Sequence, residues 1–297
     1  MKRKREKQQT KGEKRAKITP LRFISWNVNG LRAQLSKGSL QQLLSTWKPD
    51  IVCLQEIKLQ PKHIATVQSS LDSGYSVYWN CCEECKGQAG VALSTLLYTV
   101  HRDVRSFLLR TALLSLQPPL HVSYGLSQSS TGGDGRVLVA EYPNWYLVTV
   151  YFPQPGNHFE RLSEKIAWEK DFQALSQSLQ KGKPVICLGD FNTITSDLDC
   201  PKKHLPRLTA HFDRTEIDSF RETVAQLGWR DGFRALHPED PGFTYYSARD
   251  KKAREKGNGW RLDYAFFSST IFPALESCMV LDTHQGSDHF PLLVALS

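Results

Sequence analysis

Short apolar runs alternate with amphipathic segments along most of this chain, and the alternation predicts its secondary structure. Apolar and β-branched runs bounded by turn residues predict strands at residues 21–26, 51–55, 75–79, 90–94, 136–142, 145–152, 185–188, 243–247, 261–267 and 290–296. Apolar residues at helical spacing, with Ser39 and Asp213 as N-caps, predict helices at residues 39–48, 61–71, 162–179 and 213–228. This order of strands and helices favours an α/β or layered α+β fold.

Two stretches interrupt this pattern. Residues 95–117 fit a helix by the spacing of their apolar positions, but their β-branched residues and scattered arginines leave a strand open. Residues 127–135 are rich in Ser, Thr and Gly and predict a loop. Because we find no internal repeat and no linker that would force a division, we expect residues 21–297 to form one domain.

Polar side chains follow several of the predicted strands. The apolar run at 185–188 continues into Gly189, Asp190 and, two residues later, Asn192. A buried strand that stops at polar groups usually presents them to a cleft. We therefore predict that the strand ends converge on one site, which contains Asn27, Glu56, Asp190, Asn192, Asp263, Asp288 and His289.

The chemistry of this set favours a hard cation. Carboxylate and amide oxygens without cysteine suit Mg²⁺, which binds one or two carboxylates and keeps waters for a phosphate substrate. A lone histidine beside such a cation is better placed to stabilise charge than to ligate. Taken singly, each residue also has a structural explanation, since Asp190 could cap a turn, Glu56 could begin a loop and Asp263 could pair with Arg261 or a lysine.

Five segments of the chain resemble the motifs of the exonuclease III family of class II apurinic/apyrimidinic endonucleases. In order, they are residues 25–33 (SWNVNGLRA), 54–58 (LQEIK), 189–192 (GDFN), 259–264 (GWRLDY) and 286–289 (GSDH). GDFN and the final DH are shared with a wider superfamily that includes deoxyribonuclease I, sphingomyelinases and inositol polyphosphate phosphatases. NGLRA and WRLDY are more specific, and the resemblance runs from about residue 21 to the C-terminus.

The resemblance implies a four-layer α/β sandwich, in which two packed mixed β-sheets are flanked by helices and the site lies at one edge of the sheets. It also implies that Glu56 is the principal ligand of Mg²⁺, for which Mn²⁺ can substitute. Asn27 and Asp288 would bind the metal themselves or contact the groups that bind it, and Asn29 would lie close by.

The resemblance divides the remaining site residues between the attacking water and the phosphate. Asp190 would orient or deprotonate the water, and Asn192 would help to hold it. His289, oriented by Asp263, would hydrogen-bond the scissile phosphate beside Tyr151. This division agrees with the chemistry, because a phosphodiester resists attack through its own negative charge, which a cation, an imidazole and a phenol stabilise while a carboxylate activates water.

The implied activity is hydrolysis of the phosphodiester 5′ to an abasic site in duplex DNA, which leaves a 3′-hydroxyl and a 5′-deoxyribose phosphate in base excision repair. Accompanying 3′–5′ exonuclease and 3′-phosphodiesterase activities belong to the same family pattern. The flipped sugar would enter a pocket at Tyr245, Trp260 and Leu262, although core packing is the alternative for the last two. Further positions that match the family's DNA contacts are Arg32, Lys37, Arg136, Gln154 and Arg249.

The chain departs from the family pattern at several places. Asn29 and Gln154 stand where the vertebrate branch has Asp and Asn, but the bacterial branch resembles this chain at both. Ile24 occupies the place of a vertebrate cysteine linked to redox regulation, so we do not expect that second role. Asn157 replaces a basic position that contacts DNA, and residues 96–117 look inserted.

The positive charge of the chain is concentrated in its first residues. The formal net charge is +8, and residues 1–17 hold nine Lys or Arg against two Glu, which leaves +1 for the rest. We expect residues 1–20 to be a disordered basic tail. The Lys-Arg-Lys-Arg run at 2–5 indicates a nuclear-import signal, and hence a nuclear protein, or a loose phosphate-binding arm; a solvated tail without a specific role is the alternative.

The cysteines and the hydropathy of the chain indicate its compartment and its relation to membranes. Seven cysteines without a secretory leader favour reduced thiols in an intracellular protein. Cys81, Cys82 and Cys85 have the spacing of half a zinc site, but no second pair follows at a matching interval. No apolar run approaches the roughly 18 to 20 residues of a membrane helix, so we expect no membrane association, and we expect a monomer.

Two other functions are alternatives to the endonuclease hypothesis. One is a different phosphoesterase of the superfamily that acts on lipid or inositol phosphates, and it is disfavoured because nothing here resembles the recognition segments of those families. The other is a non-catalytic DNA-binding protein. It is disfavoured because every catalytic position is filled and because the nearly neutral remainder of the chain gives little nonspecific DNA affinity without the tail.

Overall fold

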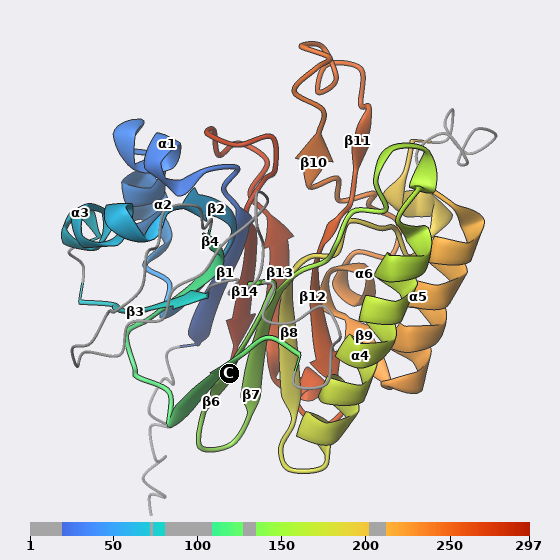
Figure 1. The fold of residues 1–297 in the computed structure, drawn as a ribbon, viewed down its shortest axis with the longest axis horizontal. Coiled ribbons are helices and arrows are strands. Elements are labelled where there is room, and N and C mark those ends of the chain that lie inside the picture. Colours follow the sequence, from blue (N-terminus) through green and yellow to red (C-terminus); the bar gives the residue numbers. More distant parts are fainter. Residues whose placement is uncertain (1–19, 72–73, 81–108, 127–134, 202–211) are drawn as a thin grey trace, which may run out of the picture.

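Two β-sheets packed face to face form the centre of the molecule, and helices cover their outer faces (Figure 1). This computed structural model describes residues 20–71, 74–80, 109–126, 135–201 and 212–297. Within these ranges each of the two sheets has six strands and includes both parallel and antiparallel pairs. The predicted four-layer α/β sandwich is confirmed.

The first sheet has the strand order β13-β14-β1-β2-β4-β3. Its strands are β1 (Leu21–Asn27), β2 (Ile51–Leu59), β3 (Ser76–Asn80), β4 (Leu109–Ser115), β13 (Leu275–Val280) and β14 (Leu292–Leu296). β1 and β2 run parallel. The outer face carries the helices α1 (Leu31–Ser36), α2 (Ser39–Trp47) and α3 (Ile64–Ser70), the last preceded by the 3₁₀ turn η1 (Pro61–His63) (Figure 1).

The second sheet has the strand order β5-β6-β7-β8-β12-β9. Its strands are β5 (His121–Tyr124), β6 (Val137–Glu141), β7 (Tyr146–Tyr151), β8 (Val185–Asp190), β9 (Trp229–Asp231) and β12 (Asp263–Ser268). The long helices α4 (Leu162–Gln180) and α5 (Arg214–Gln226) cover its outer face, and the two-stranded β10 (Tyr245–Tyr246) and β11 (Gly259–Trp260) project beyond both sheets (Figure 1). Shorter elements are α6 (Gly232–Leu236), η2 (Asn157–Phe159), η3 (Asp197–Asp199) and η5 (Phe272–Ala274).

Three apolar clusters fill the three spaces between the four layers. Leu40 and Leu43 of α2 pack with Val52 of β2 on the outer side of the first sheet. A second cluster joins the inner faces of the two sheets. The third places Phe172 and Phe220 of the helices against the second sheet. Burial of apolar area, which stabilises by roughly 25 cal/mol per Å², therefore acts at every interface of the sandwich.

The structure corrects several predicted elements. Residues 109–115, part of the segment 96–117 that looked inserted, form β4, which pairs with β2 on one side and β3 on the other. That part of the segment therefore belongs to the sheet, while residues 96–108 and the predicted strand at 90–94 lie outside the described residues. Helix α1, strands β5, β9 and β13, and helix α6 were not predicted.

The two predicted helix caps have opposite outcomes. Asp213 caps α5 as predicted, because its carboxylate accepts a hydrogen bond from the backbone N–H of Thr215. Ser39 is not a cap. It is the first residue of α2, follows Gly38 at the cap position, and donates its hydroxyl hydrogen to the side chain of Gln34 at 2.8 Å.

Candidate active site

The turn after β8 fixes the first pair of predicted site residues. β8 is buried throughout, and Gly189 lets it approach β7, because a Cβ atom there would lie 1.9 Å from the carbonyl oxygen of Val150. The carboxylate of Asp190 accepts the backbone N–H of Asn192 at 2.9 Å. Asn192 adopts a φ of 48°, a left-handed conformation that costs energy outside glycine.

Asn27, at the end of β1, joins the two halves of the site. Its buried side-chain amide donates one hydrogen bond to Glu56 Oε1 at 3.1 Å and one to Asp190 Oδ2 at 2.9 Å. Glu56 lies on β2 and Asp190 on β8, so one amide connects a carboxylate of the first sheet with a carboxylate of the second. The predicted convergence of these strand ends is present.

Glu56 is held in an unusual backbone conformation and in a favourable electrostatic environment. It does not end its strand, as the sequence indicated, but lies within β2 where the register shifts and φ is 49°. Its Oε2 pairs with Lys58 Nζ at 2.6 Å, and its Oε1 accepts the hydroxyl hydrogen of Tyr151 at 2.9 Å. Burial opposes its charge, but Lys58 and Asn27 outweigh burial and hold the pKa of Glu56 below its usual range.

Asp288 and Asn29 lie beside Glu56. Asn29 donates to Asp288 Oδ1 at 2.9 Å, and its own Oδ1 accepts from Lys58 Nζ. The ammonium of Lys58 therefore bridges an oxygen of Glu56 and an oxygen of Asn29. The oxygens of Glu56 and Asn29 thus already bind one cationic group. Oxygen ligands of this kind are what a hard divalent cation requires.

His289 lies between two carboxylates. Its Nδ1 is 2.8 Å from Asp263 Oδ2, and its Nε2 is 3.8 Å from Asp190 Oδ2. The indole of Trp26 donates to its backbone carbonyl at 3.1 Å. Burial opposes the charge on the imidazole, but Asp263 and Asp190 outweigh burial and raise the pKa of His289 to about 10.

Asp190 and Tyr151 have proton affinities that differ from those of exposed residues. Burial, together with the neighbouring carboxylate of Asp263, raises the pKa of Asp190 to about 7, even though His289 acts in the opposite direction. Burial and the charge of Glu56 hold the pKa of Tyr151 well above its usual value. Tyr151 therefore keeps its proton and can donate a hydrogen bond, and Asp190 binds a proton more tightly than an exposed aspartate does.

Two groups of side chains could hold a cation, and they differ in chemistry. Asp190, Asp263 and His289 bring ligand atoms within 4.8 Å of one another. With the pKa of His289 raised to about 10, however, a metal in that cluster would have to displace a proton from the imidazole. The group around Glu56 and Asp288 offers oxygen atoms alone, so it fits Mg²⁺ better.

A cleft of about 700 Å³ opens beside these groups. Tyr245 and Trp260 stack with their ring centroids 5.6 Å apart and 11° between planes, and Tyr245 also contacts the imidazole of His289 at 4.8 Å. Gln154 donates to Asn192 Oδ1 at 3.2 Å. The cleft unites catalytic, metal-site and DNA-contact predictions, since its lining includes Asn29, Glu56, Gln154, Tyr245, Arg249, Trp260, Leu262, Asp288 and His289.

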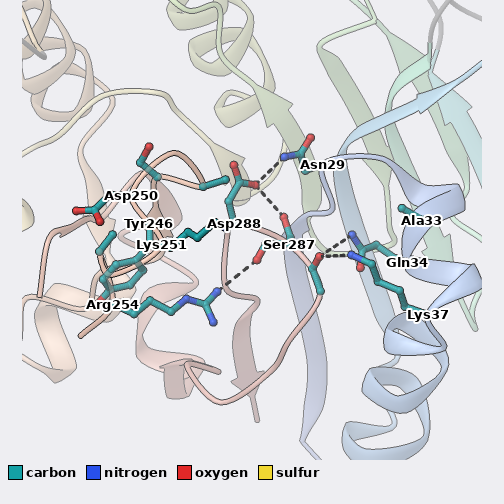
Figure 2. Close-up of a pocket in the computed structure, with 14 residues that line it drawn as sticks. Asn29, Ala33, Gln34, Lys37, Tyr246, Asp250, Lys251, Arg254, Ser287 and Asp288 are labelled. Carbon is teal, nitrogen blue, oxygen red and sulfur yellow. Dashed lines mark hydrogen bonds between the residues drawn. The ribbon is translucent and has the colours of Figure 1, made fainter. Parts of the chain in front are cut away.

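A second cavity of about 390 Å³ lies on the other side of Asn29 and Asp288, which line both spaces. Figure 2 shows Lys37, the residue that follows α1, on one side of it, with Lys251 and Arg254 of the segment between β10 and β11 on the other. Lys37 donates to the carbonyl of Gly286 at 3.1 Å. The predicted DNA contact at Lys37 thus borders the site without lining the main cleft.

Among the described residues, two other predicted DNA contacts also lie outside the lining of the main cleft. Arg32 is on the exposed side of α1, with Nη1 3.5 Å from His63 Nε2. Arg136 donates to the carbonyl of Tyr151 at 3.2 Å and lies over the ring of that tyrosine at 5.0 Å. Arg136 therefore supports Tyr151 directly.

Lys58 was not assigned a role from the sequence, although it belongs to the LQEIK segment. A lysine two residues after a predicted metal ligand, on the same side of the strand, is the signal that would have identified it.

The alternative pairing of Asp263 with Arg261 is excluded, because Arg261 pairs with Asp199 and Asp231. The tail 1–19 and the group Cys81, Cys82 and Cys85 lie outside the described residues, whereas the thiols of Cys53, Cys187, Cys200 and Cys278 are free and buried.

The fold and this site define a member of the endonuclease/exonuclease/phosphatase family, and the chain belongs to that family, whose sequence pattern matches residues 24–289. Over 278 residues the chain is 32% identical to DNA repair nuclease APEX1 of Danio rerio, a match that covers 93% of this chain and 82% of that protein. Over 273 residues it is 32% identical to an exodeoxyribonuclease of Bacillus subtilis (strain 168), covering 92% of this chain and 98% of that protein.

The structure is also similar to an AP endonuclease from Archaeoglobus fulgidus, with a TM-score of 0.75 and 23% identity over 93% of this chain and 99% of that one. At this identity the likeness concerns the fold. Together the matches confirm the resemblance drawn from the five motifs. Among the helices that the structure describes, none has both the length and the apolar character needed to cross a membrane.

Proposed function

We propose that this protein is a DNA repair endonuclease that hydrolyses the phosphodiester 5′ to abasic sites in duplex DNA. The observation that carries the proposal is the shared hydrogen bonding of Asn27, which joins the cleft-lining carboxylate of Glu56 to the buried carboxylate of Asp190 beside His289. The similarity to a DNA repair nuclease and to an exodeoxyribonuclease supports DNA as the substrate. It also supports accompanying exonuclease activity at 3′ ends.

Glu56 and Asp288, with Asn29, would hold Mg²⁺, and Mn²⁺ would fit the same oxygen donors. When bound, the cation would neutralise charge on the phosphate and stabilise the charge that develops in the transition state. Lys58 leaves room for this role, because its side chain is 43% exposed and can move away from the two oxygens that it bridges.

The residues at the end of the second sheet would act on the water and the phosphate. Asp190 would take a proton from the water as the water oxygen bonds to phosphorus. The bond from phosphorus to the 3′-oxygen of the preceding nucleotide would break, its electron pair would stay on that oxygen, and a proton from solvent water would complete the 3′-hydroxyl. His289, held by Asp263, would donate a hydrogen bond to a phosphate oxygen. Tyr151 would donate to another, with the phosphate replacing Glu56 as the acceptor of its hydroxyl hydrogen. Asn192 would hold the water beside Asp190.

The aromatic wall of the cleft supports recognition of an abasic sugar. Tyr245 and Trp260 stack beside His289, and the side chain of Leu262 is mostly buried behind them. A sugar without a base would fit against this wall, whereas a complete nucleotide would be rejected by its size. Arg249 lines the same cleft and would approach the duplex at the lesion.

The proposal is tested with a duplex that carries one tetrahydrofuran analogue of an abasic site, incubated with the protein in Mg²⁺ or in EDTA. We expect a single cut 5′ to the analogue that requires Mg²⁺ and leaves a 3′-hydroxyl. An otherwise identical duplex without the analogue is the control. Absence of a Mg²⁺-dependent cut from protein that is shown to be folded by circular dichroism would contradict the proposal.

A nuclear location and a monomeric state are part of the proposal. The Lys-Arg-Lys-Arg run at residues 2–5 supports nuclear import. A fluorescent fusion of the full chain should accumulate in nuclei, and a fusion in which these four residues are changed to serine should not. Light scattering of the purified chain should give the mass of one copy.

A further inference from the structure

Lys165 is a charged side chain buried between α4, α5 and the turn that follows β8. Its side chain has 0% exposure, and lysine is almost never fully buried unless it is paired. The ammonium has two partners: it donates to Glu216 of α5, and it donates to the backbone carbonyl of Asn192 at 2.8 Å. The second contact connects a remote helix to the candidate active site.

The carbonyl that Lys165 contacts belongs to the left-handed residue of the turn. The N–H of Asn192 is held by Asp190 Oδ1 at 2.9 Å, and its carbonyl is held by Lys165, so both backbone groups of this residue are fixed. Its side-chain amide also donates to the carbonyl of Phe152 at 3.0 Å. If the carbonyl were released, the φ of 48° would have less to maintain it.

We propose that Lys165 is a positioning residue for the hydrolytic reaction. By holding the carbonyl of Asn192, its ammonium keeps the turn after β8 in the conformation that aims the carboxylate of Asp190 at the water and leaves Oδ2 facing His289. The inference rests on the proposed function, since it assigns Asp190 the role of base. Lys165 does not line the cleft and acts only through the turn.

A purely structural role would be an ion pair that connects α4 with α5. Glu216 distinguishes the two roles, because it shares the ion pair, whereas among the described residues the hydrogen bond to the carbonyl of Asn192 comes from Lys165. Lys183 provides a control with the same kinds of contact but a less buried side chain, which is 23% exposed. It pairs with Glu141 Oε1 at 2.6 Å and donates to the carbonyl of Tyr142 at 2.8 Å, the same two kinds of contact, but just before the start of β8, at its opposite end.

The test uses four variants of the full chain: Lys165→Met, Glu216→Gln, Lys183→Met and the double variant Lys165→Met/Glu216→Leu. The double variant removes both buried charges and fills their place with apolar side chains, an exchange that proteins often tolerate. For each variant we would measure the urea midpoint of unfolding, kcat and KM on the abasic-analogue duplex, and the hydrogen-exchange rate of the Asn192 backbone amide.

We expect Lys165→Met to lower kcat by about 10²-fold with little change in KM, because a small displacement of a reacting group costs about that much. The double variant should recover the urea midpoint but not kcat, and its Asn192 amide should exchange faster than in the wild type. Glu216→Gln and Lys183→Met should lower the urea midpoint and keep kcat.

Recovery of kcat together with the urea midpoint in the double variant would overturn the inference, as would a loss of kcat in Glu216→Gln equal to that in Lys165→Met. Failure of the proposed function is recognised separately, because the wild type would then not cut the duplex. The exchange rate of the Asn192 amide does not depend on activity. An unchanged rate in the double variant would therefore overturn the positioning role whatever the reaction.

Discussion

Two carboxylates of the site, one on each sheet, have pKa values shifted in opposite directions. Glu56, on the first sheet, has its pKa lowered because Lys58 and Asn27 outweigh the effect of burial. Asp190, on the second sheet, has its pKa raised to about 7 by burial and by Asp263. Both accept a hydrogen bond from the same amide of Asn27. The difference therefore comes from the surroundings of each carboxylate.

The two surroundings suit the two separate tasks of phosphodiester hydrolysis. A carboxylate that stays ionised and keeps an oxygen near an exposed cation suits metal binding. A buried carboxylate that gains and loses its proton near neutral pH suits a general base.

The largest effect is expected for Asp190→Asn. The amide keeps the shape of the side chain but cannot take a proton from water, so kcat should fall by about 10³- to 10⁴-fold, and added Mg²⁺ should not restore it. Single-turnover incision of the abasic-analogue duplex measures this. Asp197→Asn, at a carboxylate that is 61% exposed, is the control and should keep full activity. A loss of kcat of less than tenfold in Asp190→Asn would show that Asp190 is not the general base.

His289→Asn should lower kcat by about 10²- to 10³-fold and change the pH profile. In the wild type, activity should rise with pH as Asp190 loses its proton near pH 7 and fall near pH 10 as His289 loses its own. The variant should lack the fall near pH 10. Its rising limb should move to higher pH, because the charge of His289 lowers the pKa of Asp190.

The profile of kcat between pH 5 and pH 10.5 measures both changes. Since the tetrahydrofuran analogue does not undergo base-catalysed strand cleavage, the substrate remains intact across this range. A fall near pH 10 that persists in His289→Asn would show that another group is responsible for it.

Glu56→Ala should have a smaller effect that depends on the metal concentration. Loss of one ligand weakens metal binding, so activity at low Mg²⁺ should fall by about 10- to 100-fold and should recover in part as Mg²⁺ is raised. Rates measured across a Mg²⁺ series, with ionic strength held constant, test this. Asp190→Asn is the matched comparison, and rescue of both variants by metal would contradict the separate roles.

The smallest effect is expected from deletion of residues 1–17, which carry a net charge of +7. Fewer phosphate contacts release fewer counterions, so the dependence of DNA affinity on salt should become less steep, while kcat on short duplexes should stay unchanged. Fluorescence anisotropy at several salt concentrations measures the slope. An unchanged slope would argue against a tail that contacts DNA.

Local sequence pattern was sufficient for much of the second sheet and its site. The apolar run before Asp190 predicts a buried strand that presents polar groups, and β8 is buried along its whole length. β4 could not be predicted with the same certainty, because it is defined by pairing with β2, whose paired residues lie 50 to 64 positions earlier in the chain (Leu59 with Leu109, Ile51 with Ser115). Its apolar spacing alone fits both a helix and a strand.

The buried polar contacts could not be predicted from the sequence for a related reason. The apolar spacing predicts α4, but its buried face also includes Lys165 and Glu169, which a hydrophobic pattern assigns to solvent. The position of Glu56 depends on a register shift and a left-handed backbone within β2. Neither feature has a signature in a single sequence, since both arise from contacts between distant segments.

The separation of the two carboxylates is tested most directly by metal binding without turnover. Electron paramagnetic resonance can follow Mn²⁺ binding to the wild type, Glu56→Ala and Asp190→Asn in the absence of DNA. We expect Glu56→Ala to weaken Mn²⁺ binding by about 10- to 100-fold and Asp190→Asn to leave it nearly unchanged. The opposite result, with Mn²⁺ affinity lost in Asp190→Asn and kept in Glu56→Ala, would place the metal on the Asp190 side and contradict the assignment.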